Sequence, residues 1–183
     1  MKFRRTELDG VFLIDIEPQT DDRGWFARTF CKKEFAEAGC PAEFVQINQS
    51  FNKTAHTFRG FHFQLPPMQE TKLIRCVSGS LRDFVIDLRK GSKTFLRNIE
   101  VNLSAENQKS ILIPGGFAHG FLTLEDNTSL IYHHTQYYSP SSERGLRFDD
   151  PAIGLHLEKL IKVVSDRDRS YPILEQTFLG IEI

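Results

Sequence analysis

Short apolar segments separated by turn-forming residues recur along most of the chain. Each has the length and the β-branched or aromatic content of a β-strand, and glycine, proline, asparagine or aspartate lies beside it. Many short strands of this kind are typical of a β-sandwich or β-barrel and not of alternating β-α units. The expected strands are Val11–Glu17, Gly24–Phe30, Phe44–Gln49, Phe58–Gln64, Lys72–Val77, Leu81–Leu88, Phe95–Leu103, Lys109–Ile113, Gly120–Leu124 and Ser129–Thr135.

Helical patterns are confined to two short segments. Lys32–Ala38 ends at Gly39, a common helix stop, and Gly154–Ile161 is the second candidate. Both are too short to form a core of their own, so we expect them at the periphery of a β-structure.

The length of the chain and its charge balance narrow the possible classes. A chain of 183 residues fits one domain. We expect a single domain over residues 1–183, with a barrel core at about 43–140 on which N-terminal strands and a C-terminal tail pack. The net charge of -1 and the absence of long Lys/Arg runs exclude an ordinary nucleic-acid binder.

Nothing in the sequence predicts export or membrane insertion. No stretch reaches the about 18 consecutive apolar residues of a membrane span, and the basic start is followed by polar residues instead of a signal-peptide core. The three cysteines are odd in number and widely spaced, which favours a reducing compartment. We expect a cytoplasmic protein with no membrane partner and no nucleic-acid partner.

Strand alternation brings several reactive side chains to one side of the predicted sheets. In Phe58–Gln64, His62 and Gln64 share a face, while Lys72 and Tyr132 lie on inward-facing positions of two later strands. Taken singly, each has an ordinary structural interpretation. Together, inside a small barrel, they predict a polar pocket.

The segment Pro114–Phe121 resembles the second conserved stretch of cupins, a turn that delivers a histidine, here His119, into the barrel. Metal cupins pair it with an H-x-H segment and a glutamate. Here the H-x-H position reads His62-Phe63-Gln64, and an amide is a poor ligand, although Glu70 remains available. We expect no bound metal; a metal-dependent cupin is the less favoured alternative.

Ordered motifs along nearly the whole chain resemble the dTDP-4-dehydrorhamnose 3,5-epimerase family, the metal-free cupins of deoxysugar biosynthesis. So many matches in order are far more specific than a single motif. They are Asp22-Arg23-Gly24, Arg59-Gly60-Phe61-His62-Phe63-Gln64-Leu65-Pro66-Pro67, Lys72-Leu73-Ile74-Arg75-Cys76, Val101-Asn102-Leu103-Ser104-Ala105-Glu106-Asn107, Ile113-Pro114-Gly115-Gly116-Phe117-Ala118-His119-Gly120-Phe121, Tyr137-Tyr138-Ser139-Pro140, Ser142-Glu143-Arg144-Gly145 and Ser165-Asp166-Arg167-Asp168.

The resemblance implies a cupin-type jelly-roll β-barrel and proton transfer beside the ketone of a nucleotide-linked 4-keto-6-deoxyhexose. His62 would be the general base and Asp168 would orient its imidazole. Tyr132 would return a proton from the opposite ring face, and Lys72 would stabilise the enolate oxygen. The ketone is itself the electron sink, so no cofactor is expected.

The resemblance also implies residues that bind the substrate. Arg23 and Arg59 would hold the pyrophosphate, and Tyr138 would stack near the nucleobase. Strand alternation puts Arg59 opposite His62, so either Gly60 lies in a bulge or Arg59 reaches the ligand at the rim. His119 is alternatively structural, held by a neighbour such as Asp83. The other expected substrate contacts are Gln46, Asn48, His119, Glu143 and Arg167.

Three departures from the family pattern concern the nucleotide and the number of centres inverted. Arg28 stands where an acidic residue is expected, Ile47 where Asp is common, and His133-His134 where a Lys-Thr pair is usual. A carboxylate accepts the N3–H of thymine, whereas an arginine only donates and suits cytosine. A dTDP-4-dehydro-6-deoxy-D-glucose 3,5-epimerase is expected, and a CDP-4-keto-3,6-dideoxyhexose 5-epimerase or a mono-epimerase is the rival.

Two further expectations concern partners and catalysis. The resemblance implies a homodimer with exchanged N-terminal strands, so Arg23 would serve the neighbour's pocket. A sugar-nucleotide-binding cupin without turnover is the non-enzyme alternative. The joint presence of His62, Lys72, Tyr132 and Asp168 counts against it, because binding alone needs no acid and base.

Overall fold

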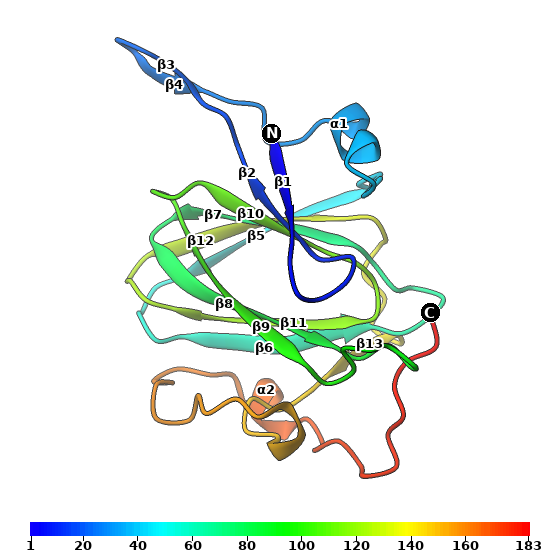
Figure 1. Ribbon diagram of the computed structural model, residues 1–183. Coiled ribbons are helices and arrows are strands. Elements are labelled where there is room, and N and C mark those ends of the chain that lie inside the picture. The colour runs from blue at the N-terminus through cyan, green and yellow to red at the C-terminus, as the bar shows by residue number, and fades with distance from the viewer.

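Two antiparallel sheets face each other and form the body of the molecule (Figure 1). The computed structural model describes all residues, 1–183. The six-stranded sheet has the order β1-β2-β10-β7-β12-β5, and the five-stranded sheet has the order β13-β6-β11-β8-β9. The strands of the six-stranded sheet are β1 (Lys2–Arg5), β2 (Phe12–Asp15), β10 (Lys109–Ile113), β7 (Lys72–Ser78), β12 (Thr128–His134) and β5 (Gln46–Asn52).

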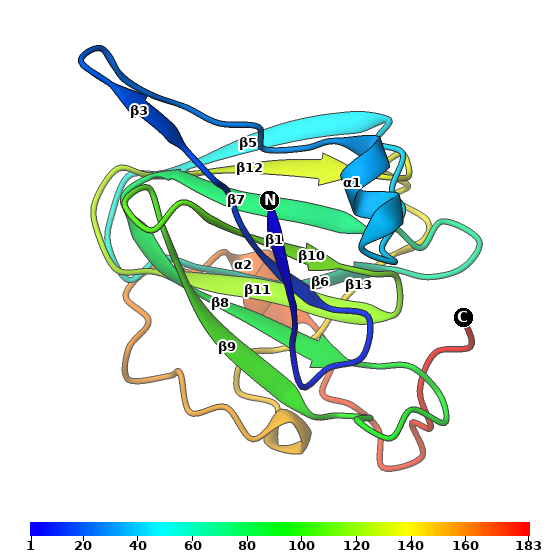
Figure 2. The same cartoon turned by 45° about the horizontal axis from the view of Figure 1, so that its top comes forward.

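The remaining elements complete the second sheet and its surroundings. A separate hairpin of β3 and β4 projects away from the barrel in both views (Figures 1 and 2). None of the helices is both long and apolar enough to cross a membrane. These elements are β13 (Glu143–Gly145), β6 (Phe58–Gln64), β11 (Phe117–Thr123), β8 (Ser80–Asp87), β9 (Asn98–Ser104), β3 (Gln19–Asp21), β4 (Gly24–Phe26), the helices α1 (Lys32–Glu37) and α2 (Asp166–Ser170), and the 3-10 turn η1 (Pro151–Ile153).

The predicted all-β jelly roll with short peripheral helices is confirmed, but the prediction of a helix at Gly154–Ile161 is wrong. Asp150 caps the preceding turn η1 by accepting from the Ala152 amide at 2.9 Å. Gly154 ends that turn with φ at 65°, in the left-handed region that favours glycine. The following apolar residues continue as irregular chain and pack on the barrel's outer face.

Three apolar clusters hold the layers together. One fills the barrel interior next to the polar cavity, with Ile74, Val85 and Leu130 at 0% exposure. A second lies between the outer face of the five-stranded sheet and the C-terminal tail, and a third lies under α1, around Phe35. Each fully buried large side chain contributes about 1.5–3 kcal/mol, so the tail that carries Asp168 is firmly attached to the barrel.

A bulge at Gly60 sets the direction of the side chains along β6. The pairing of β6 with β11 shifts register between His119 and Phe121, opposite Gly60. Alternation restarts after the bulge, so both Arg59 and His62 point into the cavity. Of the two possibilities that the sequence left open for Arg59, the bulge is the one observed.

We expect Gly60→Ala to destabilise the protein, because an added Cβ would lie 2.5 Å from the Gly120 Cα and Gly60 has φ at 139°. Overpacking of this kind costs about 1–3 kcal/mol, and the strained φ adds to it. Thermal unfolding measures the effect. Gly91→Ala is a matched control, since its φ is also positive, at 72°, but no atom lies within 4 Å of its added Cβ. An equal loss in both variants would contradict the role of the close backbone contact.

Candidate active site

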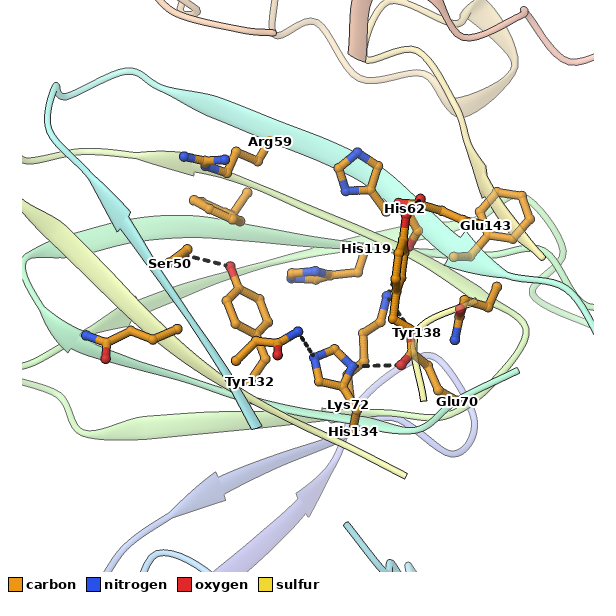
Figure 3. Close-up of a pocket in the computed structure, with 15 residues that line it drawn as sticks. Ser50, Arg59, His62, Glu70, Lys72, His119, Tyr132, His134, Tyr138 and Glu143 are labelled. Carbon is orange, nitrogen blue, oxygen red and sulfur yellow. Dashed lines mark hydrogen bonds and ion pairs between the residues drawn. The ribbon is translucent and has the colours of Figure 1, made fainter. Parts of the chain in front are cut away.

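A polar cavity of about 300 Å³ lies between the two sheets (Figure 3). Strands of both sheets supply its walls, since inward-facing positions of β5, β7 and β12 meet those of β6 and β11. Its lining residues are Asn48, Gln49, Ser50, Arg59, His62, Phe63, Gln64, Glu70, Lys72, His119, Phe121, Tyr132, His134, Tyr138 and Glu143.

His62 is oriented by a buried carboxylate from the C-terminal tail. Its Nε2 lies 2.8 Å from Oδ1 of Asp168, whose side chain is 5% exposed. Burial opposes ionisation of Asp168, but hydrogen bonds from His62, the Gly60 amide and Ser165 outweigh it and hold its pKa below the ordinary value. The ionised carboxylate stabilises an imidazolium, and Nδ1 remains as the ring nitrogen available for proton transfer.

Tyr132 enters the cavity from β12, on the sheet opposite His62 (Figure 3). Its hydroxyl lies 3.2 Å from Ser50 Oγ, and its ring stacks on His134 at 6.2 Å between centroids. Burial raises the pKa of Tyr132 well above its ordinary value. The phenol is therefore protonated at neutral pH.

Lys72 brings a fixed cation to the cavity. Its Nζ lies 3.3 Å from the His62 carbonyl oxygen, to which it donates, and 3.3 Å from Oε1 of Glu70. The side chain is only 11% exposed. An ammonium held in a place with little water stabilises developing negative charge more strongly than one in solvent.

His119 lies at the cavity wall and is also held from behind, as the sequence allowed. Its Nε2 is 2.8 Å from Oδ2 of Asp83, which is fully buried. Burial raises the pKa of Asp83 above its ordinary value, although His119 opposes this effect.

The mouth of the cavity carries a second group of predicted residues. Tyr138 donates its hydroxyl to Glu143 Oε2 at 2.6 Å, and Arg167 forms an ion pair with the same carboxylate. Tyr138 is 53% exposed, so its ring is available for stacking. Arg59 Nε donates to Asn52 Oδ1 at 2.7 Å, which leaves the other guanidinium nitrogens for a ligand.

Four predicted substrate residues do not line this cavity: Gln46 and Arg167 bond to residues that line it, whereas Arg23 and Arg28 lie away from it. Arg23 is on the projecting β3–β4 hairpin, pairs with Asp21 and is 90% exposed. Arg28 donates to Glu34 Oε1 at 2.6 Å, beside a separate hollow. Within one chain neither side chain lines the cavity.

Sequence reasoning assigned no role in the site to Gln49, Ser50 or His134, and it considered Glu70 only as a metal ligand and not as a partner of Lys72. Alternation signalled His134, which shares the inward face of its strand with Tyr132. No local signal identified Ser50, whose role depends on the pairing of β5 with β12. No group of three or more His, Cys, Asp or Glu side chains has the arrangement of a metal site.

A jelly-roll interior with a carboxylate-bound imidazole on one wall and a phenol on the other is typical of the cupin-fold isomerases. Residues 5–176 match the sequence model of dTDP-4-dehydrorhamnose 3,5-epimerase. The chain belongs to the dTDP-4-dehydrorhamnose 3,5-epimerase family.

The chain resembles known epimerases in sequence and in fold over nearly their full lengths. The chain is 40% identical to the dTDP-4-dehydrorhamnose 3,5-epimerase of Sinorhizobium fredii, over 95% of this chain and 90% of that protein. The crystal structure of the Bacillus anthracis enzyme with TDP and PPi bound has a TM-score of 0.90 at 36% identity, covering 94% of this chain and 99% of that chain. The Legionella pneumophila enzyme in complex with dTDP-4-keto-L-rhamnose has a TM-score of 0.90 at 31% identity, covering 100% and 98%.

Proposed function

We propose that this enzyme inverts C3 and C5 of dTDP-4-dehydro-6-deoxy-D-glucose in deoxysugar biosynthesis. The observation that carries the proposal is the placement of the His62–Asp168 pair and Tyr132 on opposite sheets, with Lys72 in the same cavity. Two carbons flank the C4 ketone, and the protons on both are acidified by it. A base on one ring face and an acid on the other invert either carbon.

In the proposed reaction, His62 Nδ1 takes the proton as the C–H bond breaks, and the electron pair moves through the new C=C bond to the C4 oxygen. The Lys72 ammonium stabilises that enolate oxygen, a contribution of about 3–4 kcal/mol for a well-placed donor. Tyr132 donates its proton to the opposite face as the enolate collapses. Exchange with solvent then removes the proton from His62 and restores that of Tyr132, so each inversion is proton-neutral and uses no redox cofactor.

A thymidine nucleotide is the proposed carrier. The relatives are named for dTDP sugars, and the Bacillus anthracis structure carries TDP. Arg59 and Arg167 would meet the pyrophosphate side of the ligand, and the exposed Tyr138 ring would stack on the base. Arg28, the residue behind the cytidine alternative, is already paired with Glu34.

Solvent-deuterium exchange tests the proposal. In D₂O, purified enzyme should introduce deuterium at both C3 and C5 of the dTDP-linked 4-keto sugar, as followed by NMR, and should turn over the CDP-linked 4-keto-3,6-dideoxyhexose at least about 100-fold less efficiently. Label at one carbon would make it a mono-epimerase, and preference for the cytidine sugar would overturn the thymidine assignment. No label on either substrate would make the protein a binder.

We further propose a homodimer in which the β3–β4 hairpin reaches the neighbouring subunit. Trp25 is 49% exposed and Phe26 is 77% exposed on that hairpin, while Ile47 and Phe51 are exposed on edge strand β5. Large apolar side chains gathered on a projecting hairpin and a sheet edge favour a protein interface. Arg23 would then enter the partner's cavity.

A cytoplasmic location fits the three unpaired cysteines.

Subunit mixing tests the shared site. Arg23→Ala and His62→Ala should each be inactive alone, but a subunit-exchanged 1:1 mixture should recover about one quarter of wild-type activity. Half of its dimers would be mixed, and each mixed dimer would hold one intact site. Failure to recover activity in a mixture shown to contain mixed dimers, or a mass near the 21.1 kDa of one chain, would refute this arrangement.

A further inference from the structure

Glu70 and His134 are charged or titratable groups in the cavity that the reaction above does not use. Their side chains are 8% and 11% exposed, which is unusual for such groups unless they are paired. Glu70 precedes β7, and His134 is the last residue of β12. Both lie beside Lys72 (Figure 3).

One carboxylate is shared between a cation and an imidazole. Oε1 of Glu70 lies 3.3 Å from Lys72 Nζ, and Oε2 lies 2.7 Å from His134 Nδ1. Burial opposes ionisation of Glu70, but the hydrogen bond from His134 and the positive charge of Lys72 outweigh it, so its pKa lies below the ordinary value. Glu70 is therefore an acceptor for both neighbours.

This arrangement fixes the tautomer of His134. Because the ionised carboxylate accepts the Nδ1–H, Nε2 of the neutral ring carries the lone pair and faces Asn48 Nδ2 at 3.5 Å. Asn48 Oδ1 in turn accepts from Gln46 Nε2 at 3.2 Å, and Gln46 Oε1 accepts from the Tyr138 amide at 3.2 Å. A chain of hydrogen bonds thus connects the ammonium of Lys72 to the mouth of the cavity.

These hydrogen bonds are needed because the lysine side chain is flexible. An ammonium on a four-carbon stem stabilises an enolate only where it is held at the developing oxyanion. The His62 carbonyl and Glu70 hold Lys72 from two sides. A carboxylate used by Lys72 alone would cancel much of the positive field at the ketone. His134 reduces this effect, because it donates a hydrogen bond that stabilises part of the negative charge of Glu70.

We propose that Glu70 and His134 are positioning residues, which act through Lys72 and Asn48 and do not touch the reacting carbons. The proposal rests on the function proposed above, because it takes Lys72 as the group that stabilises the enolate. The interaction is needed most in the transition state, so its loss reduces kcat more than it changes KM.

Steady-state kinetics of Glu70→Gln, His134→Leu and Lys72→Met, together with the double variant Lys72→Met/Glu70→Gln, test the proposal. Glu70→Gln should lower kcat by about 10- to 100-fold with KM within about threefold. In the Lys72→Met background the same substitution should cost less than about twofold, because the residue through which it acts is gone. Glu100→Gln is the control: it removes a carboxylate paired with Arg82 on β8 and β9, away from the cavity, and should leave both constants unchanged.

His134→Leu keeps the Lys72–Glu70 ion pair and so leaves no buried charge unpaired. It carries the test if Glu70→Gln melts below the assay temperature, and it should lower kcat by about 10-fold at nearly constant KM. Unchanged kcat in the folded variants, or an undiminished loss in the Lys72→Met background, would overturn the positioning role. If the wild-type enzyme itself is inactive, both the proposed function and the positioning role are overturned. If the wild type is active and the variants have the same kcat, only the positioning role is overturned.

Discussion

Replacing His62 with alanine is expected to lower the rates of deuterium incorporation and of product formation by about 10²–10⁴-fold or more. The substitution removes the only imidazole in the cavity whose nitrogen is bonded to Asp168, at 2.8 Å. Without it, no base takes the proton from the carbon beside the ketone. NMR in D₂O measures both losses in one sample.

His156→Ala is the matched control for this prediction. His156 is exposed on the C-terminal tail, so its removal should leave exchange unchanged. Deuterium incorporation by His62→Ala within about tenfold of the wild-type rate would show that another group is the base.

Tyr132→Phe is expected to separate exchange from inversion. Phenylalanine keeps the ring that stacks on His134 but has no hydroxyl at Ser50. His62 still removes the proton and returns a solvent-derived one to the same face. Deuterium therefore enters the sugar with retained configuration, while inverted product falls by about 10²–10⁴-fold.

Tyr137→Phe provides the comparison, since Tyr137 is 60% exposed and does not line the cavity. It should leave the ratio of exchange to inversion at the wild-type value. A parallel loss of exchange and inversion in Tyr132→Phe would mean that the phenol has a part in proton removal, and unimpaired inversion would mean that another group is the acid.

The strands that the apolar pattern located best are those buried on both faces. β6 and β10 have the predicted bounds, because layers on each side bury nearly all of their residues. The edge strands β1 and β13 were missed: their sequences, KFRR and ERG, carry almost no apolar signal, and backbone pairing alone defines them. Helix α2 was also missed, because its sequence DRDRS has no apolar stripe and the Ser165 cap is its only local signal.

The residues of the candidate site also differ in how far the sequence alone could predict them. Alternation placed His62, Lys72 and Tyr132 on inward faces, and the cavity includes all three. Asp168 came from family resemblance alone, because a contact across 106 residues leaves no periodic trace in the sequence. Arg59 required the bulge at Gly60, which depends on the pairing with β11. The role assigned to Arg23 stays a prediction, since it requires a second subunit.

The crystal structure of the enzyme with its dTDP-linked 4-keto sugar is the most direct test of the account. We predict that the sugar ring lies between His62 and Tyr132, with His62 Nδ1 facing one side of the ring, the Tyr132 hydroxyl facing the other, and Lys72 Nζ within hydrogen-bond distance of the C4 oxygen. A ring with both side chains on the same face, or a sugar bound outside the cavity, would contradict it.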